Sequence, residues 1–194
     1  MKKFVYGICL ALAVAFVAPS QAQSPKIQPY FYENAVGEWG VQGHNKTEGT
    51  ADACVIHKIW EDGSKFILVF DLESGEIFSM MHYTKWNLKE RKKPVAGAMH
   101  VRKDKKRVAG GKAEYIYGDK NTVIMPGINP RNFFSALRQG DELELDVPKE
   151  LAQTGVFIPL KDFELALIQV AECMLAHEKM KDPNILPQIR KRDI

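Results

Sequence analysis

The feature that most constrains the fold is a long succession of short apolar segments, which polar turns separate at close intervals. These segments run from Trp39 to Met125, and clusters of Gly, Asp, Asn, Ser and Lys end most of them. Strands are predicted over 54–60, 65–72, 77–83, 96–103, 113–117 and 122–125, after a first strand near Trp39. Segments that are joined by tight turns pair with their neighbours, so we expect an antiparallel meander or a sandwich-like sheet. Around the Gly110–Gly111 pair, we expect the strand material to be broken.

Helix signals appear only after residue 128. Asn129 can cap a helix, Pro130 suits its first position, and Gly140 suits its end. The strictly alternating segment 142–147 is a predicted half-buried strand, and 155–160 a short one. A second helix is predicted over 161–176, and its apolar residues share one face: Phe163, Ala166, Leu167, Val170, Cys173 and Met174. The predicted fold class is therefore mainly β, of the α+β type, with two helices near the C-terminus.

The N-terminus has the layout of a bacterial signal peptide over residues 1–22. Lys2 and Lys3 precede an apolar run from Phe4 to Val17, and the small residues Ser20 and Ala22 follow at the cleavage positions. The run is shorter than the ~20 residues of a spanning helix. We therefore expect export to the periplasm, with secretion or surface association as further options, and no transmembrane segment in the mature form.

Composition divides the rest of the chain into three parts. Residues 23–35 carry two prolines among polar residues, so we expect a flexible lead-in. Residues 36–176 hold all the predicted strands and helices and are expected to form one domain. Residues 177–194 form a basic tail with two prolines that we expect to be loosely held.

Two cysteines remain after the signal peptide leaves with Cys9. In an exported protein, Cys54 on a strand and Cys173 on the buried face of a helix indicate one disulfide. Two separate buried thiols are the alternative.

Charge is segregated along the chain. Residues 85–112 are rich in Lys and Arg, opposed only by Glu90 and Asp104, whereas residues 48–76 are rich in acidic side chains. The predicted basic face consists of Lys85, Lys92, Lys93, Arg102, Lys103, Lys105, Lys106, Arg107 and Lys112. Such a face would attract an anionic envelope component, such as lipid head groups, or an acidic envelope protein. Lysines on exposed hairpins also protect strand edges from aggregation, and the sequence leaves both roles open.

Aromatic residues near these cations leave a similar choice open. Tyr83, Trp86, Tyr115 and Tyr117 would either form a stacking surface or fill the sheet face.

The sequence contains no strong motif for catalysis or metal binding. The chain has no G-x-S-x-G motif, and the carboxylates Glu142, Glu144 and Asp146 alternate with apolar residues as on a solvated strand face. Only a convergence of His57, His82 and His100 would indicate a site. The formal net charge of +3, which loss of Lys2 and Lys3 lowers by two, does not favour nucleic-acid binding. We therefore predict no enzyme activity, no cofactor, no metal and no nucleic-acid partner.

Three segments, together with the hairpins between them, resemble a known family. They are "GEWGVQ", "NPRNFFSALRQGDELELDV" and "GVFIPLKDFELALIQVAEC", and their order is similar to that in the invasion-associated locus B family of exported bacterial proteins. The matching positions are Phe134, Ala136, Leu137, Gly140, Leu160, Phe163, Ala166, Leu167 and Cys173. Gly43 stands near the place where members often carry a further cysteine. The resemblance implies a compact β-rich exported fold and an association with host-cell invasion, but no enzyme reaction.

The predicted function is that of an exported, non-enzymatic envelope accessory or binding protein that supports host-cell interaction. The alternative is a periplasmic inhibitor or immunity-like protein that binds a cell-wall hydrolase through an exposed loop such as "LESGEIF". The sequence leaves the partner and the oligomeric state open.

Overall fold

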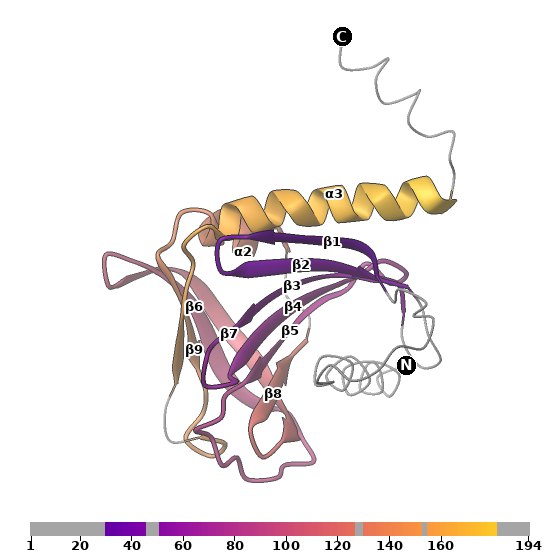
Figure 1. Cartoon of the computed structure of the whole chain (residues 1–194). Coiled ribbons are helices and arrows are strands. Elements are labelled where there is room, and N and C mark those ends of the chain that lie inside the picture. Colours follow the sequence, from indigo (N-terminus) through magenta and orange to yellow (C-terminus); the bar gives the residue numbers. More distant parts are fainter. Residues whose placement is uncertain (1–29, 46–50, 127–129, 153–154, 182–194) are drawn as a thin grey trace.

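A computed structural model describes residues 30–45, 51–126, 130–152 and 155–181. Within these residues, ten strands form one antiparallel sheet in the order β1-β2-β3-β4-β5-β8-β7-β6-β9-β10 (Figure 1). The strands are β1 Tyr30–Val36, β2 Trp39–His44, β3 Ala53–Ile59, β4 Lys65–Asp71, β5 Ile77–His82, β6 Val95–Lys103, β7 Lys106–Asp119, β8 Thr122–Met125, β9 Glu142–Asp146 and β10 Val156–Pro159. The helices are α2 Pro130–Leu137 and α3 Phe163–Lys181. The predicted fold class, mainly β with two helices near the C-terminus, is confirmed.

Turn chemistry accounts for the meander from β3 to β5. In the β3–β4 turn, Asp62 accepts a hydrogen bond from the backbone N–H of Ser64 at 2.9 Å, and Gly63 has a φ of +83°. In the β4–β5 turn, Asp71 accepts from the backbone N–H groups of Glu73 and Ser74. Carboxylates that bond the backbone two or three residues ahead stabilise tight turns, so these hairpins close locally.

Strand β7 joins the two halves of the sheet. It pairs with β6 along its first part and with β8 along its last part. The Gly110–Gly111 pair does not break this strand, contrary to our expectation, because Gly110 adopts a φ of +127° and stays paired with His100. A glycine at this φ permits a conformation that other residues rarely adopt.

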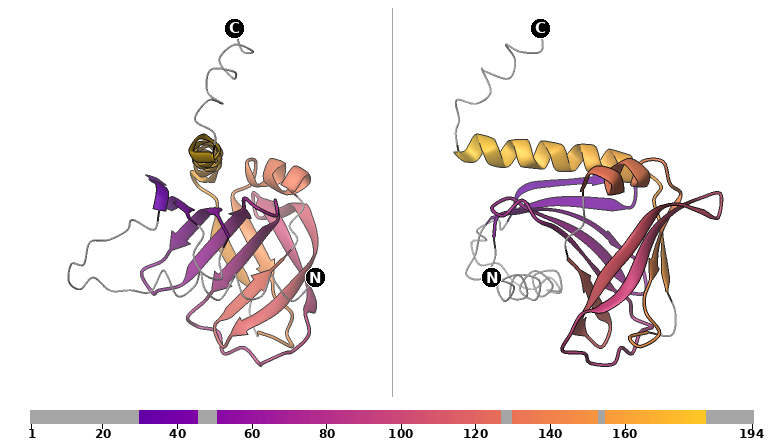
Figure 2. Two further views of the ribbon diagram at one scale, coloured as in Figure 1. Left: turned by 90° about the vertical axis from the view of Figure 1, so that its right-hand side faces the viewer. Right: turned by 180° about the vertical axis from the view of Figure 1, so that it is seen from behind.

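The main core lies between the two halves of the curved sheet. Figure 2 shows that β6, β7 and β9 stand at an angle across from β2–β5. Side chains that alternate along β3 and β4, such as Ile56, Phe66 and Leu68, pack in one cluster with Leu143 and Leu145 of β9. A smaller cluster, which includes residues such as Val55, Ile67 and Val69, forms with the alternate side chains of the same strands.

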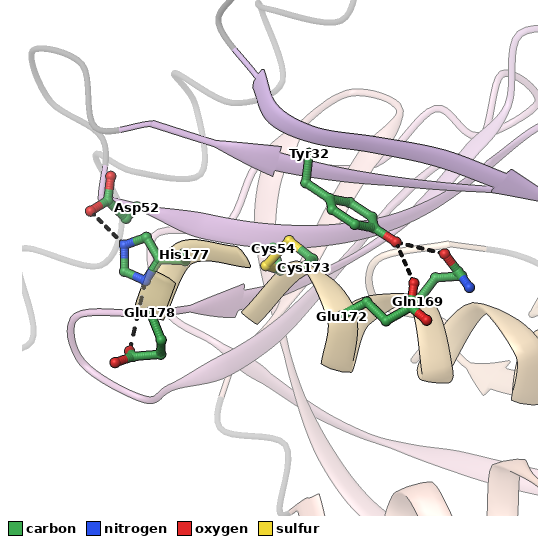
Figure 3. The surroundings of a disulfide bond; sticks show 8 residues. All are labelled: Tyr32, Asp52, Cys54, Gln169, Glu172, Cys173, His177 and Glu178. Atoms are coloured by element: carbon green, nitrogen blue, oxygen red, sulfur yellow. Dashed lines mark hydrogen bonds and ion pairs between the residues drawn. A yellow bond between two sulfur atoms is a disulfide. The ribbon is translucent and has the colours of Figure 1, made fainter. Parts of the chain in front are cut away.

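Helix α3 runs along β1, β2 and β3 (Figure 1). At its N-terminal end, the indole N–H of Trp39 donates to the carbonyl of Lys161 at 2.8 Å, and the Trp39 ring packs edge-on against Phe163. Further along, Cys173 forms a disulfide with Cys54 of β3, 119 residues away in sequence. Figure 3 shows this bond between the Tyr32–Gln169 and His177–Asp52 contacts, so the helix is attached to the sheet at three levels.

Two predicted boundaries are wrong. The flexible lead-in was expected to reach residue 35, but residues 30–36 form β1, because Tyr32 and its neighbours pair with β2 and contact α3. The basic tail was expected to begin at residue 177, but α3 continues to Lys181, and His177 is only 2% exposed beside Asp52. The signal peptide 1–22, residues 23–29 and residues 182–194 lie outside the described residues.

Candidate functional site

The β6–β7 hairpin carries the most prominent group of predicted cations. Lys103 and Lys106 flank a two-residue turn in which Asp104 and Lys105 both have positive φ, at 50° and 63°. Positive φ at both central positions is the backbone of the turn that suits tight hairpins. Figure 1 shows this hairpin extending beyond the rest of the sheet. Lys103, Lys105 and Lys106 are all exposed, and we call them the basic tip.

Two hydrogen bonds hold the basic tip in place. The Arg102 guanidinium donates to the carbonyl of Lys105 at 2.6 Å. The backbone N–H of Asp104 donates to the Asp141 carboxylate at 2.8 Å. The turn is therefore attached to the connection before β9, and the lysine side chains project from a fixed backbone.

The two arginines of the predicted basic face are already paired. Arg107 binds Glu144 with two hydrogen bonds of 2.9 and 2.7 Å, and Asp146 at 3.2 Å. Arg102 lies 3.7 Å from Glu142 and 3.8 Å from Glu144. The hydrogen bonds from Arg107 lower the pKa of Glu144, and the same contacts raise the pKa of Arg107.

The sequence had indicated that these β9 carboxylates form a solvated strand face. The face does point outwards, with Asp146 exposed and Glu142 half-exposed, but β6 and β7 bring arginines from about 40 residues earlier in the chain onto it and largely cover Glu144. The intervening Leu143 and Leu145 are fully buried, as the alternation predicted.

The remaining predicted cations lie elsewhere. Lys85, Lys92 and Lys93 are exposed in the connection before β6, whereas the basic tip follows β6. A nine-residue strand separates the two groups by roughly 30 Å, at ~3.3 Å per residue. Lys112 lies between them, opposite Ala98. The nine cations therefore do not meet on one continuous face.

The aromatic candidates fill the sheet face around the main core, and the histidine candidates do not converge. Tyr115 and Trp86 are buried in the main core, whereas Tyr83 and Tyr117 are half-buried. The histidines sit on three different strands, His57 on β3, His82 on β5 and His100 on β6. Among the described residues, no three His, Cys, Asp or Glu side chains form a group that could hold a metal ion.

A cleft that the sequence did not reveal lies where the end of β3 faces the start of β10. Its volume is about 800 Å³. It is lined by Glu38, Lys58, Ile59, Trp60, Glu61, Asp62, Ser64, Met81, Tyr83, Gly155, Val156 and Phe157. This volume lies in the range of small-molecule sites in proteins.

Lys58 is the unusual residue of this cleft. It follows Cys54 and Ile56 on the inward-facing side of β3, and it is only 2% exposed. Its ammonium group lies 2.5 Å from a Glu38 carboxylate oxygen, and 5.3 and 5.7 Å from the ring centroids of Trp39 and Trp60. The hydrogen bond from Lys58 lowers the pKa of Glu38. The sequence did carry a signal for this site: an isolated lysine at a core position of a predicted strand, with a tryptophan two residues later.

Charge on the cleft wall is otherwise negative. Glu61 and Asp62 are exposed in the β3–β4 turn. Asp62 accepts hydrogen bonds from the Ser64 backbone and from the Thr84 hydroxyl, and the first of these lowers its pKa. Asp62 is therefore committed to the turn rather than directed into the cleft.

Together, the fold and these surfaces define a curved antiparallel sheet protein with a helix tied across one end by a disulfide. No protein-family model matches the sequence, and no curated protein matches it. Among solved structures, the chain is similar to the crystal structure of invasion associated protein B from Bartonella henselae. The likeness has a TM-score of 0.50 at 16% identity, and it covers 73% of this chain and 96% of that one. At this identity, the comparison shows a shared fold.

Proposed function

We propose that this chain is an exported, non-enzymatic binding protein of the bacterial envelope, related to the invasion-associated proteins, which contacts an anionic partner through its basic tip. The observation that carries the proposal is the projecting β6–β7 hairpin, whose three exposed lysines stand on a hydrogen-bonded turn. The partner is an anionic envelope component or an acidic envelope protein. The proposed role in host-cell interaction is supported by the sequence resemblance to the invasion-associated locus B family and by the fold shared with invasion associated protein B.

Two observations support export. The first 22 residues have the layout of a signal peptide, and the Cys54–Cys173 disulfide suits an oxidising compartment such as the periplasm. In the described part of the chain, neither helix is long and apolar enough to cross a bilayer.

Charge pairing distinguishes the basic tip from the rest of the hairpin. Arg102 and Arg107 are neutralised by β9 carboxylates, so their charge contributes little at a distance. The three lysines of the tip have one acidic neighbour within the turn, Asp104. Exposed charges act over about one Debye length, ~10 Å at moderate salt, so a projecting tip can attract an anionic surface before contact.

The test is crosslinking and capture in cells that export the protein. The variant changes Lys103, Lys105 and Lys106 to Glu, and leaves both arginines intact because they stabilise the sheet. The matched control changes Lys85, Lys92 and Lys93 to Glu, which alters net charge equally at the other end of β6. We expect one envelope partner to be captured by the wild type and the control, and lost by the tip variant. Equal capture by all three proteins would refute the role of the tip.

A second candidate function is inhibition of a cell-wall hydrolase through the β4–β5 turn. This turn is exposed, has Ser74 at its tip, and is held by hydrogen bonds to Asp71, as an inhibitory loop requires. The same capture experiment separates the candidates. Recovery of a hydrolase that is unaffected by the tip variant and lost on inserting three glycines after Ser74 would favour inhibition.

A further inference from the structure

The 800 Å³ cleft is separate from the basic tip, and a buried lysine, Lys58, lies in its wall. Lysine is rarely buried unless it is paired, because removal of an ammonium ion from water is unfavourable by several kcal/mol. Here Lys58 is 2% exposed, yet its partner Glu38 has a side chain that is 74% exposed. The cation is therefore a fixed part of the cleft wall, whereas the carboxylate that neutralises it reaches in from the surface.

Glu38 is placed so that it can leave this contact. It lies in the β1–β2 turn directly after Gly37, which has a φ of +59°. A glutamate side chain that is mostly in water loses little when it rotates away from Lys58, provided that another anion takes its place. The Glu38 carboxylate thus occupies the position that a carboxylate ligand would take.

The other walls of the cleft are aromatic or apolar. Trp60 and Tyr83 lie on the side of β3–β5, and Phe157 and Val156 lie on β10. Val156 faces the core, as Lys58 does, whereas Phe157 alternates to the other face of β10, where the guanidinium carbon of Arg102 lies 5.0 Å from its ring centroid. These walls suit a flat or elongated apolar body.

The remaining charges restrict the ligand further. Glu61 and Asp62 at the rim disfavour a ligand with a large negative charge. Their effect is screened because they are exposed, whereas the attraction of buried Lys58 acts in a less polar environment. A single negative charge on an apolar body satisfies both conditions.

We propose that this cleft binds a small monocarboxylate with an apolar or aromatic body, whose carboxylate pairs with Lys58 and displaces Glu38. The ligand body then packs against Trp60 and Tyr83. This site is independent of the envelope contact proposed for the basic tip.

Isothermal titration of the mature protein tests the proposal with three probes that differ in one group: 4-phenylbutyrate, 4-phenylbutanol and 4-phenylbutylamine. At pH 7 we expect the carboxylate to bind at least about tenfold more tightly than the alcohol and the amine. Equal binding of all three, preferred binding of the amine, or no binding of the carboxylate would overturn it.

Two variants test the roles of the charged pair. Glu38→Gln frees Lys58 from its internal carboxylate, so we expect 4-phenylbutyrate to bind about three- to tenfold more tightly. Lys58→Met keeps the side-chain length without the charge, and we expect it to lose preference for the carboxylate over the alcohol. Weaker binding to Glu38→Gln would overturn the proposal even if Lys58→Met failed to fold. The tip variant, with Glu at positions 103, 105 and 106, should bind the probe as the wild type does.

Discussion

Gly110 illustrates how a single residue sets the path of a strand. A Cβ atom at this position would lie 2.2 Å from the carbonyl oxygen of Met99 and 2.6 Å from the Cα of His100. The φ of +127° adds strain for any L-amino acid with a side chain. Its neighbour Gly111 has no atom within 4 Å of the same test position, so the two glycines form a natural pair for comparison.

We predict that Gly110→Ala lowers the free energy of unfolding by at least about 2 kcal/mol, because the new methyl group meets backbone atoms that cannot rotate away. Gly111→Ala should change it by less than about 1 kcal/mol. Urea unfolding followed by tryptophan fluorescence measures both. Similar values for the two variants would show that β7 does not approach β6 as closely as described.

A second single residue, His44, makes the stability of the folded chain depend on pH. Burial lowers its pKa to about 4 from an ordinary value of 6.5, and the charge of His57 acts in the same direction. Above pH 6.5 the ring is neutral in the folded and the unfolded chain. As pH falls from 6.5 towards 4, the unfolded chain binds a proton that the folded chain does not, so stability is lost across that range.

Between pH 7 and pH 5 this residue should reduce the free energy of unfolding by about 2 kcal/mol. The measurement is urea unfolding at the two pH values for the wild type and His44→Gln, which cannot take up the proton. A smaller loss in the variant is expected. An identical loss in both would assign the acid sensitivity to other groups.

At the scale of elements, α3 depends on the sheet for its position. Its buried residues Phe163, Ala166, Leu167, Val170, Cys173 and His177 follow helical spacing and face β1–β3. The disulfide joins this helix to β3 across most of the domain sequence. A crosslink over so long a loop restricts the unfolded chain strongly.

We predict that the Cys54→Ser/Cys173→Ser double variant is less stable by about 2–5 kcal/mol. Because the His177–Asp52 and Tyr32–Gln169 contacts remain, the folded helix should stay docked. Thermal unfolding with and without reductant checks this: reductant should destabilise the wild type and leave the variant unchanged. If reductant has no effect on the wild type, the two thiols are separate in the isolated protein.

At the scale of the whole molecule, curvature of the sheet brings distant segments together. The strand order passes from β5 to β8 and returns through β7 and β6 to β9, so the pairs β5–β8 and β6–β9 join strands that are not consecutive in sequence. This curvature places β10 opposite the end of β3, which creates the cleft, and it sends the basic tip outwards.

The proposed export predicts a defined product at this scale. Material isolated from the periplasm should begin at Gln23, and its intact mass should be lower than that of the reduced form by two hydrogen atoms. Mass spectrometry before and after reduction measures both properties. A product that retains residues 1–22 would contradict export by a cleaved signal peptide.

The local sequence pattern was sufficient to predict much of the fold. Most predicted strand boundaries lie within a residue or two of the observed ones, because turn residues such as Gly63 and Asp71 act over three or four positions. The apolar face of α3 and the inward direction of Leu143 and Leu145 also follow from periodicity alone. Strand β1 was missed because its stability comes from pairing with β2 and contact with α3, and neither is visible in its own residues.

The candidate sites were less accessible from sequence. The amino-acid sequence by itself determined most of the strands, their turns, the two helices and the availability of Cys54 and Cys173, since each depends on neighbours along the chain. Only the tertiary structure decided that Arg102 and Arg107 neutralise the β9 carboxylates, that the lysines separate into two groups, and that Lys58 is buried beside a cleft. The physical reason is that charge pairing and burial depend on distances through space, which the curvature of the sheet sets.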